Sequence, residues 1–136
     1  MTIVVDASIA AKWFIEEPDT RAALDIRSEP VIAPDLIVAE IANVLWKNVR
    51  LKRIAAEHCL SVMRLLPRYF RDIYPILPLA PRAAEIATTL DHPVYDAFYI
   101  ALAEREGCAL MTADNRLLRA VKGTRFAKRV RPLKDP

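Results

Sequence analysis

The feature of this sequence that most constrains its fold is an alternation of short apolar runs with longer helical patterns. TIVV at 2–5, VIA at 31–33 and CALMT at 108–112 are short and apolar, and segments with helical periodicity separate them. Such alternation is typical of α/β proteins with a mainly parallel sheet. We therefore expect an α/β fold built around a sheet of that kind.

The remaining segments fit the same plan. We expect Ser8 to cap a first helix and Pro-rich IYPILPL and RVRPL to form edge strands, where missing backbone donors are tolerated. The predicted helices cover residues 9–17, 20–27, 35–50, 55–66, 81–90, 93–106 and 113–121. No repeat, low-complexity segment or linker interrupts the 136 residues. We therefore expect a single domain over residues 1–136.

The chain shows no sign of a membrane segment or a secretory leader. No charge-free apolar run approaches the roughly 18 residues that a membrane span needs. The N-terminus, MTIVVDAS, lacks the basic, apolar and small-residue order of a signal peptide. We expect no membrane partner and a cytoplasmic location.

Two acidic residues follow predicted strands. Asp6 ends the run TIVV, and Asp114 lies two residues beyond CALMT. Ligands of parallel sheets bind outside the carboxyl ends of the strands, so the two carboxylates are expected at one edge. The alternative is that each simply caps the helix that starts after it.

Two further acidic residues fall on apolar faces of predicted helices. At about 100° per residue, Glu40 lies on the stripe formed by Leu36, Ile37, Ile41 and Val44. Asp96 interrupts VYDAFYIALA and shares its face with Tyr99, Ile100 and Ala103. An unpaired buried carboxylate is costly, so each must become neutral, pair with a cation or bind a metal.

Four such carboxylates together favour a metal. Like charges disfavour one another unless a positive charge lies between them. The apolar stretches around them contain almost no Arg or Lys, and on the first helix Lys12 is the nearest cation to any of them. Oxygen ligands without His or Cys select a hard ion such as Mg²⁺ or Mn²⁺. Pairing of Glu40 and Asp96 with Arg or Lys remains the alternative.

Four segments of the chain carry a family resemblance. They are DAS at 6–8, VAEIANVLWK at 38–47, YDAFYIALA at 95–103 and TADNRLLRA at 112–120. In this order they resemble a PIN domain, and more narrowly the VapC-type ribonuclease toxins of toxin–antitoxin pairs. The resemblance implies a three-layer α/β/α sandwich whose acidic cluster binds Mg²⁺ or Mn²⁺ and cleaves RNA. It also implies a homodimer and a VapB-like antitoxin.

The resemblance assigns roles to individual residues. It implies that Asp6, Glu40, Asp96 and Asp114 occupy the four acidic positions of the catalytic metal site, with Ser8 and Thr112 as supporting hydroxyls. Our hypothesis is that Asp6, Asp96 and Asp114 bind the first ion. Glu40 then completes the site, either as a ligand through water or by orienting the attacking water. Asn115 either hydrogen-bonds the substrate or shapes the turn.

Positive charge is unevenly spread although the net charge is only +3. KNVRLKR at 47–53 has four cations and no acid. From Arg116 to the end of the sequence there are eight cations and one acid, Asp135. Arg116 and Arg119 are three residues apart after Asp114 and are candidates to bind RNA phosphates. The alternative is a solvated helix face.

Other enzyme classes fit poorly. With only Gly107 and Gly123, neither G-x-G-x-x-G nor a P-loop can be written. No G-x-S-x-G elbow is present for a serine hydrolase. The remaining alternative is a non-catalytic PIN-like module that binds an antitoxin or nucleic acid.

Overall fold

The computed structural model describes residues 1–133, whose strands form one parallel sheet. All four strand pairings are parallel, in the order β3-β2-β1-β4-β5. The strands are β1 (Ile3–Val5), β2 (Val31–Pro34), β3 (Asp72–Tyr74), β4 (Ala109–Thr112) and β5 (Val130–Pro132). The predicted parallel sheet and the edge positions of its two outer strands are confirmed, although only Ile73 and Tyr74 of IYPILPL lie in β3 and Leu77–Leu79 form a 3₁₀ turn. Lys134 and Asp135, counted above among the C-terminal charges, lie outside the described residues.

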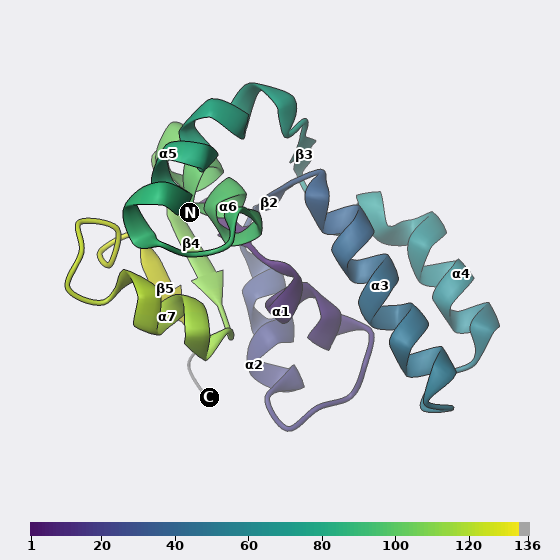
Figure 1. The fold of residues 1–136 in the computed structure, drawn as a ribbon. Helices are drawn as coiled ribbons and strands as arrows, with labels where there is room; N and C mark the ends of the chain where they lie inside the picture. The colour runs from purple at the N-terminus through teal and green to yellow at the C-terminus, as the bar shows by residue number, and fades with distance from the viewer. Residues whose placement is uncertain (134–136) are drawn as a thin grey trace.

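Helices cover the sheet in a three-layer α/β/α arrangement (Figure 1). Right-handed crossovers lead from β1 through β2 to β3 and then back from β3 to β4. The helices of the outward and return connections therefore lie on opposite faces. The helices are α1 (Ala7–Ala10), α2 (Thr20–Asp25), α3 (Leu36–Arg50), α4 (Ala56–Leu65), α5 (Ala80–Leu90), α6 (Val94–Glu106) and α7 (Asn115–Val121). No helix within residues 1–133 is long and apolar enough to cross a membrane.

The first helix differs from its prediction. Its N-cap is Asp6, not Ser8, which lies inside the helix. Asp6 has extended backbone angles directly after β1, and its carboxylate accepts a hydrogen bond from the Ile9 N–H at 3.2 Å. An Asp in that position caps as well as a Ser does. The helix is also shorter than expected, because it continues beyond Ala10 only as a 3₁₀ turn, Ala11–Trp13.

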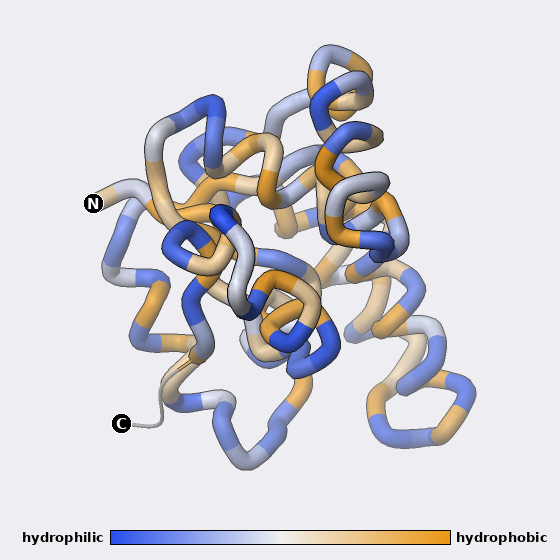
Figure 2. The backbone as a smooth tube through the Cα atoms, turned by 60° about the vertical axis from the view of Figure 1, so that its left-hand side comes forward, coloured by the Kyte–Doolittle hydropathy of each residue, from blue (hydrophilic) through white to orange (hydrophobic). Residues whose placement is uncertain are grey.

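Peripheral helices bury one side only. In α3 the buried residues recur at helical spacing, as Ile37, Ile41, Leu45 and Asn48. Figure 2 shows hydrophilic and hydrophobic residues alternating along the outer helices, as expected of helices with one face on a core. Burial of these apolar faces is the main stabilising contribution to such a fold.

The helix α6 is different because it is buried on several sides. Ala97, Tyr99, Ile100, Ala101, Leu102 and Ala103 are all buried, and α6 contacts β1, β2, β4 and α5. A helix that is apolar around its circumference is typical of a protein interior. Gly107 ends α6 in the left-handed conformation, with φ of 65°. The first turn of this buried helix is where Asp96 lies.

The strand order places a ligand site beside β1. The connections leave β1 towards β2 and leave β4 towards β5, so the winding direction reverses between these two adjacent strands. Open parallel sheets bind ligands outside the carboxyl ends of the strands at such a reversal. Val5 lies opposite Met111, so the next residues along each strand, Asp6 and Thr112, meet at that edge.

Candidate metal centre at the carboxyl edge of the sheet

Asp6 is the most buried of the four predicted carboxylates, with 4% of its surface exposed. The Ser8 hydroxyl donates to its Oδ1 at 2.5 Å, and the Thr112 hydroxyl donates to its Oδ2. Ser8 in turn accepts a hydrogen bond from the Ala113 N–H at 2.9 Å, which ties α1 to the end of β4. Both predicted supporting hydroxyls therefore contact Asp6 directly.

The charge of Asp6 is strongly perturbed by its surroundings. Burial raises the pKa of its carboxyl from 3.8 to about 6. The hydrogen bonds from Ser8, Thr112 and the Ile9 N–H oppose this shift by favouring the charged form, and the charge of Asp96 adds to it. A buried carboxylate beside another acid is a position where a cation would be strongly attracted.

Glu40 reaches the same region from α3. The Tyr99 hydroxyl on α6 donates to Glu40 Oε1 at 2.5 Å. Burial raises the pKa of the half-buried Glu40 carboxyl, and the charge of Asp96 raises it further. Burial and the charge of Glu40 raise the pKa of Tyr99 well above 10, so the phenol keeps its proton and acts as a donor.

Asp96 projects from the first turn of α6 and meets His92. His92 Nε2 lies 2.6 Å from Asp96 Oδ2, and the two side chains are 15% and 22% exposed. His92 sits on the short turn between α5 and α6, where its backbone N–H donates to Ala87 O at 3.1 Å. This backbone hydrogen bond fixes the main chain at the residue whose imidazole lies beside Asp96.

Asp114 joins the group through Thr112. Its backbone N–H donates to Thr112 Oγ1 at 3.0 Å, and the same hydroxyl donates to Asp6. The Asp114 side chain caps α7 by accepting from the Arg116 N–H at 2.9 Å. The capping role considered for Asp6 and Asp114 is therefore present at both residues.

The four carboxylates share one arrangement. Each has a hydrogen-bond partner other than a Lys or Arg side chain: hydroxyls at Asp6, a phenol at Glu40, the His92 imidazole at Asp96 and a backbone N–H at Asp114. Within residues 1–133 none of them forms an ion pair with Lys or Arg. The internal pairing considered for Glu40 and Asp96 is therefore wrong. Lys12 pairs instead with Glu17 and Asp19, at 2.6 and 2.8 Å.

The side chains do not yet converge on one point. In the described part of the chain, no three His, Cys, Asp or Glu side chains are close enough to ligate one ion. The charge of Asp96 nevertheless raises the pKa of both Asp6 and Glu40. Their chemistry suits a hard cation, because they offer carboxylate oxygens that no Lys or Arg within residues 1–133 neutralises. Rotation of side chains would be needed to complete a coordination shell.

The predicted substrate-binding residues surround the start of α7. Asn115, Arg116 and Arg119 are exposed, and neither arginine forms an ion pair within residues 1–133. Sequence reasoning missed the hydroxyl of Tyr99. The available signal was its spacing of three residues from Asp96, which places both on one face of α6.

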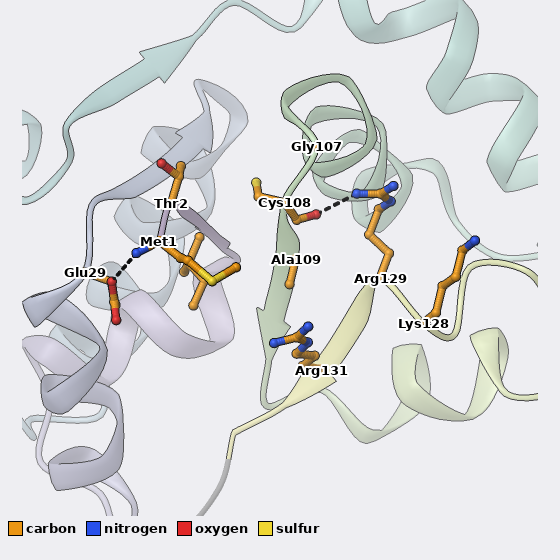
Figure 3. Close-up of a pocket in the computed structure, with 10 residues that line it drawn as sticks. Met1, Thr2, Glu29, Gly107, Cys108, Ala109, Lys128, Arg129 and Arg131 are labelled. Atoms are coloured by element: carbon orange, nitrogen blue, oxygen red, sulfur yellow. Dashed lines mark hydrogen bonds and ion pairs between the residues drawn. The ribbon is translucent and has the colours of Figure 1, made fainter.

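A separate hollow of about 390 Å³ lies at the opposite edge of the sheet (Figure 3). It is bordered by the starts of β1 and β4 and by Lys128, Arg129 and Arg131. Arg129 is held there by the Cys108 carbonyl at 2.8 Å. None of the four carboxylates lines this hollow, so it is separate from the candidate metal centre.

Comparison with known proteins gives consistent matches. The PIN domain family model matches residues 3–123. The chain is 36% identical over 115 residues to "VapC ribonuclease Mb0985" of Mycobacterium bovis, covering 85% of this chain and 87% of that protein. It is 32% identical over 121 residues to "Ribonuclease VapC3" of Pyrobaculum aerophilum, covering 86% and 92%.

A solved structure shares the fold. The "Toxin-antitoxin complex from Klebsiella pneumoniae" contains a chain that superimposes with a TM-score of 0.72 at 17% identity, covering 98% of this chain and 99% of that one. The likeness extends over the whole sheet and its helices.

Proposed function

This chain belongs to the PIN-domain family, and on that basis we propose that it is an endoribonuclease dependent on Mg²⁺ or Mn²⁺. We further propose that it acts as the toxin of a VapBC-type toxin–antitoxin pair. Support comes from relatives named as VapC ribonucleases that align with most of the chain.

One observation carries the proposal. Four carboxylates from two strand ends and two helices lie toward one sheet edge, and within residues 1–133 none of them pairs with Lys or Arg. A purely structural acid of this burial would normally pair with a cation. Negative charge left without a partner at a ligand-binding edge is what a divalent cation would neutralise.

The mechanism follows from the roles of these side chains. Asp6, Asp96 and Asp114 would hold the ion, and Glu40 would complete the site. A bound divalent ion supplies a more acidic water and stabilises charge on the phosphate. Ser8 and Thr112 keep both oxygens of Asp6 in a fixed orientation. Glu40 orients the attacking water or accepts its proton.

Substrate binding falls to exposed cations. Arg116 and Arg119 on α7 follow directly after Asp114, so phosphates bound there lie beside the carboxylates. Asn115, at the first position of α7, would donate a hydrogen bond to the RNA. Contacts of this kind give binding that weakens as salt concentration rises.

We also propose a VapB-like antitoxin and a homodimer, as the resemblance implies. The hairpin of α3 and α4 supports a protein partner, because it leaves large apolar side chains exposed. They are Val38, Trp46, Leu51, Leu60 and Leu65. Apolar patches of this kind are commonly protein interfaces.

A second candidate is a non-catalytic PIN-like module. The observation that favours it is the lack of a preassembled ligand set within residues 1–133. The two candidates differ in one respect, because only the enzyme needs the carboxylates to bind metal and cut RNA.

The test compares Asp6→Asn and Asp96→Asn with the wild type in Mn²⁺. Asn keeps the shape of Asp and still caps α1, so we expect both variants to fold but to lose RNA cleavage. Asp25→Asn, an exposed acid on α2, is the matched control and should cleave normally. If Mn²⁺ neither raises the melting temperature of the wild type nor supports cleavage, the non-catalytic module is correct.

A further inference from the structure

Tyr99 is a buried side chain with one polar contact. Only 1% of its surface is exposed, and its hydroxyl donates to Glu40 Oε1 at 2.5 Å. Its neighbours on α6 are apolar, among them Ala97, Ile100 and Leu102. A hydroxyl in such surroundings is costly unless it is hydrogen-bonded. A phenylalanine would fill the same space without that cost, so packing alone does not account for the oxygen.

The hydroxyl lies close to three of the four acids. The charges of Glu40, Asp6 and Asp96 all act on Tyr99. Tyr99 also lies one helical turn beyond Asp96 on α6, whereas Glu40 comes from α3. The Tyr99–Glu40 bond therefore sets where a side chain of α3 stands relative to an acid of α6.

Glu40 needs such a restraint more than the other acids. Its long side chain is half-buried, and it has more rotatable bonds than Asp6, which two hydroxyls and a backbone N–H hold. A donor fixed to Oε1 prevents the carboxylate from swinging away and leaves Oε2 free. Partners that hold ligating carboxylates in this way are a general feature of metal sites.

We propose that Tyr99 is a positioning residue of the ribonuclease reaction, whose hydroxyl holds Glu40 in the orientation that completes the metal site. This inference rests on the proposed function, since it gives Tyr99 a role in that same site. Tyr99 acts through Glu40 and need not touch the RNA.

The experiment removes one oxygen atom at each of two tyrosines of α6. Tyr99→Phe deletes the bonded hydroxyl, and Tyr95→Phe deletes the hydroxyl of a side chain that is 60% exposed and makes no hydrogen bond within residues 1–133. Circular dichroism without metal verifies that both variants fold. The melting temperature is then measured at increasing Mn²⁺ concentrations. The concentration that gives half of the maximal increase is the Mn²⁺ midpoint, and its measurement needs no RNA.

We expect Tyr99→Phe to raise the Mn²⁺ midpoint about 10-fold, the lower end of the effect known for such partners. RNA cleavage at subsaturating Mn²⁺ should fall by a similar factor. Tyr95→Phe should remain within about twofold of the wild type in both measurements. An unchanged midpoint in Tyr99→Phe would overturn the inference.

A double-mutant cycle separates positioning from packing. If Tyr99 acts through Glu40, Tyr99→Phe should have no further effect on the Mn²⁺ midpoint in a Glu40→Ala background. An equal effect in both backgrounds would show that the hydroxyl acts by another route. If the wild type cuts RNA and Tyr99→Phe has the same cleavage rate and the same Mn²⁺ midpoint, only the positioning role of Tyr99 is contradicted. A wild type that binds Mn²⁺ but cuts no RNA defeats the ribonuclease proposal, and the midpoints still decide the role of Tyr99.

Discussion

At the scale of single residues, Asp6 combines two roles that conflict in the absence of metal. It caps α1 and lies almost fully buried, and burial raises the pKa of its carboxyl to about 6. The native state therefore keeps this proton to higher pH than the unfolded chain, whose carboxyl titrates near 3.8. Stability from this group is fully present below pH 3.8 and is lost as pH rises through about 6.

This pKa shift predicts that Asp6→Asn changes how the free energy of unfolding depends on pH. With chelator present, the wild type should lose stability between about pH 4 and pH 6 relative to the variant, since Asn carries no titrating proton. Urea unfolding at several pH values measures this difference. At pH 8 we expect the variant to be at least as stable as the wild type. If the free energies of unfolding of the two proteins changed equally with pH, the prediction would be contradicted. The control Asp25→Asn should show the same pH dependence as the wild type.

His92 is the second residue whose contact invites a test. Its Nε2 is 2.6 Å from Asp96 Oδ2. We expect His92→Leu, which removes the partner of this carboxylate, to raise the Mn²⁺ midpoint severalfold. His92→Gln keeps a side-chain donor and should retain more of the affinity. Thermal melts in increasing Mn²⁺ measure both, and identical losses in Leu and Gln would exclude a role for the hydrogen bond.

The sequence predicted on which helix face a residue lies better than it predicted contacts between residues of different elements. Periodicity placed Glu40 and Asp96 on apolar helix faces, because that depends only on local spacing. It did not predict that Tyr99 of one helix reaches Glu40 of another, because that contact depends on how α3 and α6 pack. It also assigned the first cap to Ser8, since Asp6 and Ser8 are both good caps and only the end of β1 decides between them.

At the scale of elements, a single glycine at the C-cap position terminates α6. Gly107 has φ of 65°, and the next residue, Cys108, donates its N–H to Ala103 O at 3.0 Å. A Cβ built on Gly107 meets no atom within 4 Å. A side chain there is therefore disfavoured by backbone conformation alone, not by a clash.

This geometry predicts that Gly107→Ala lowers stability by about 1 kcal/mol, or a few degrees in melting temperature. Gly107→Asn should lose less, since Asn tolerates the left-handed region. Differential scanning calorimetry measures both. Neither change should alter the Mn²⁺ midpoint, because Gly107 is at the far end of α6 from Asp96. Equal stability of Ala and wild type would refute the argument.

Most elements matched their predicted boundaries, and the exceptions have physical causes. The helix expected over 35–50 is α3, which begins at Leu36 and ends at Arg50. The helix expected over 9–17 ends early, because the chain turns into a 3₁₀ segment at Ala11. Buried Lys12 then pairs with Glu17 and Asp19 and holds the following turn. Ion pairs between residues five and seven positions apart leave no periodic signal in the sequence.

At the scale of the whole molecule, charge separates into acidic and basic regions. The carboxylates lie at one edge of the sheet, and exposed Arg116 and Arg119 flank them. Lys128, Arg129 and Arg131 border the opposite edge. Exposed arginines without carboxylate partners keep their charge available to a polyanion.

The effect on RNA binding is testable with charge-matched variants. In an Asp6→Asn background that leaves RNA intact, Arg116→Gln/Arg119→Gln should weaken RNA binding and reduce the salt slope of log K by about 1.4 for single strands. Arg64→Gln/Arg68→Gln removes two exposed arginines near α4 and is the control. Fluorescence anisotropy at several salt concentrations measures both. Equal slopes for the two double variants would remove Arg116 and Arg119 from the RNA-binding surface.

The burial of α6 has a consequence for genetic selection. Ala97, Ala101 and Ala103 are almost fully enclosed, and the same helix presents Asp96 and Tyr99. Any larger side chain at these alanines must push the helix away from the sheet and so displace both polar groups. If the chain acts as the proposed toxin, variants selected for loss of toxicity should therefore carry substitutions at these small, chemically inert positions as well as at the acids.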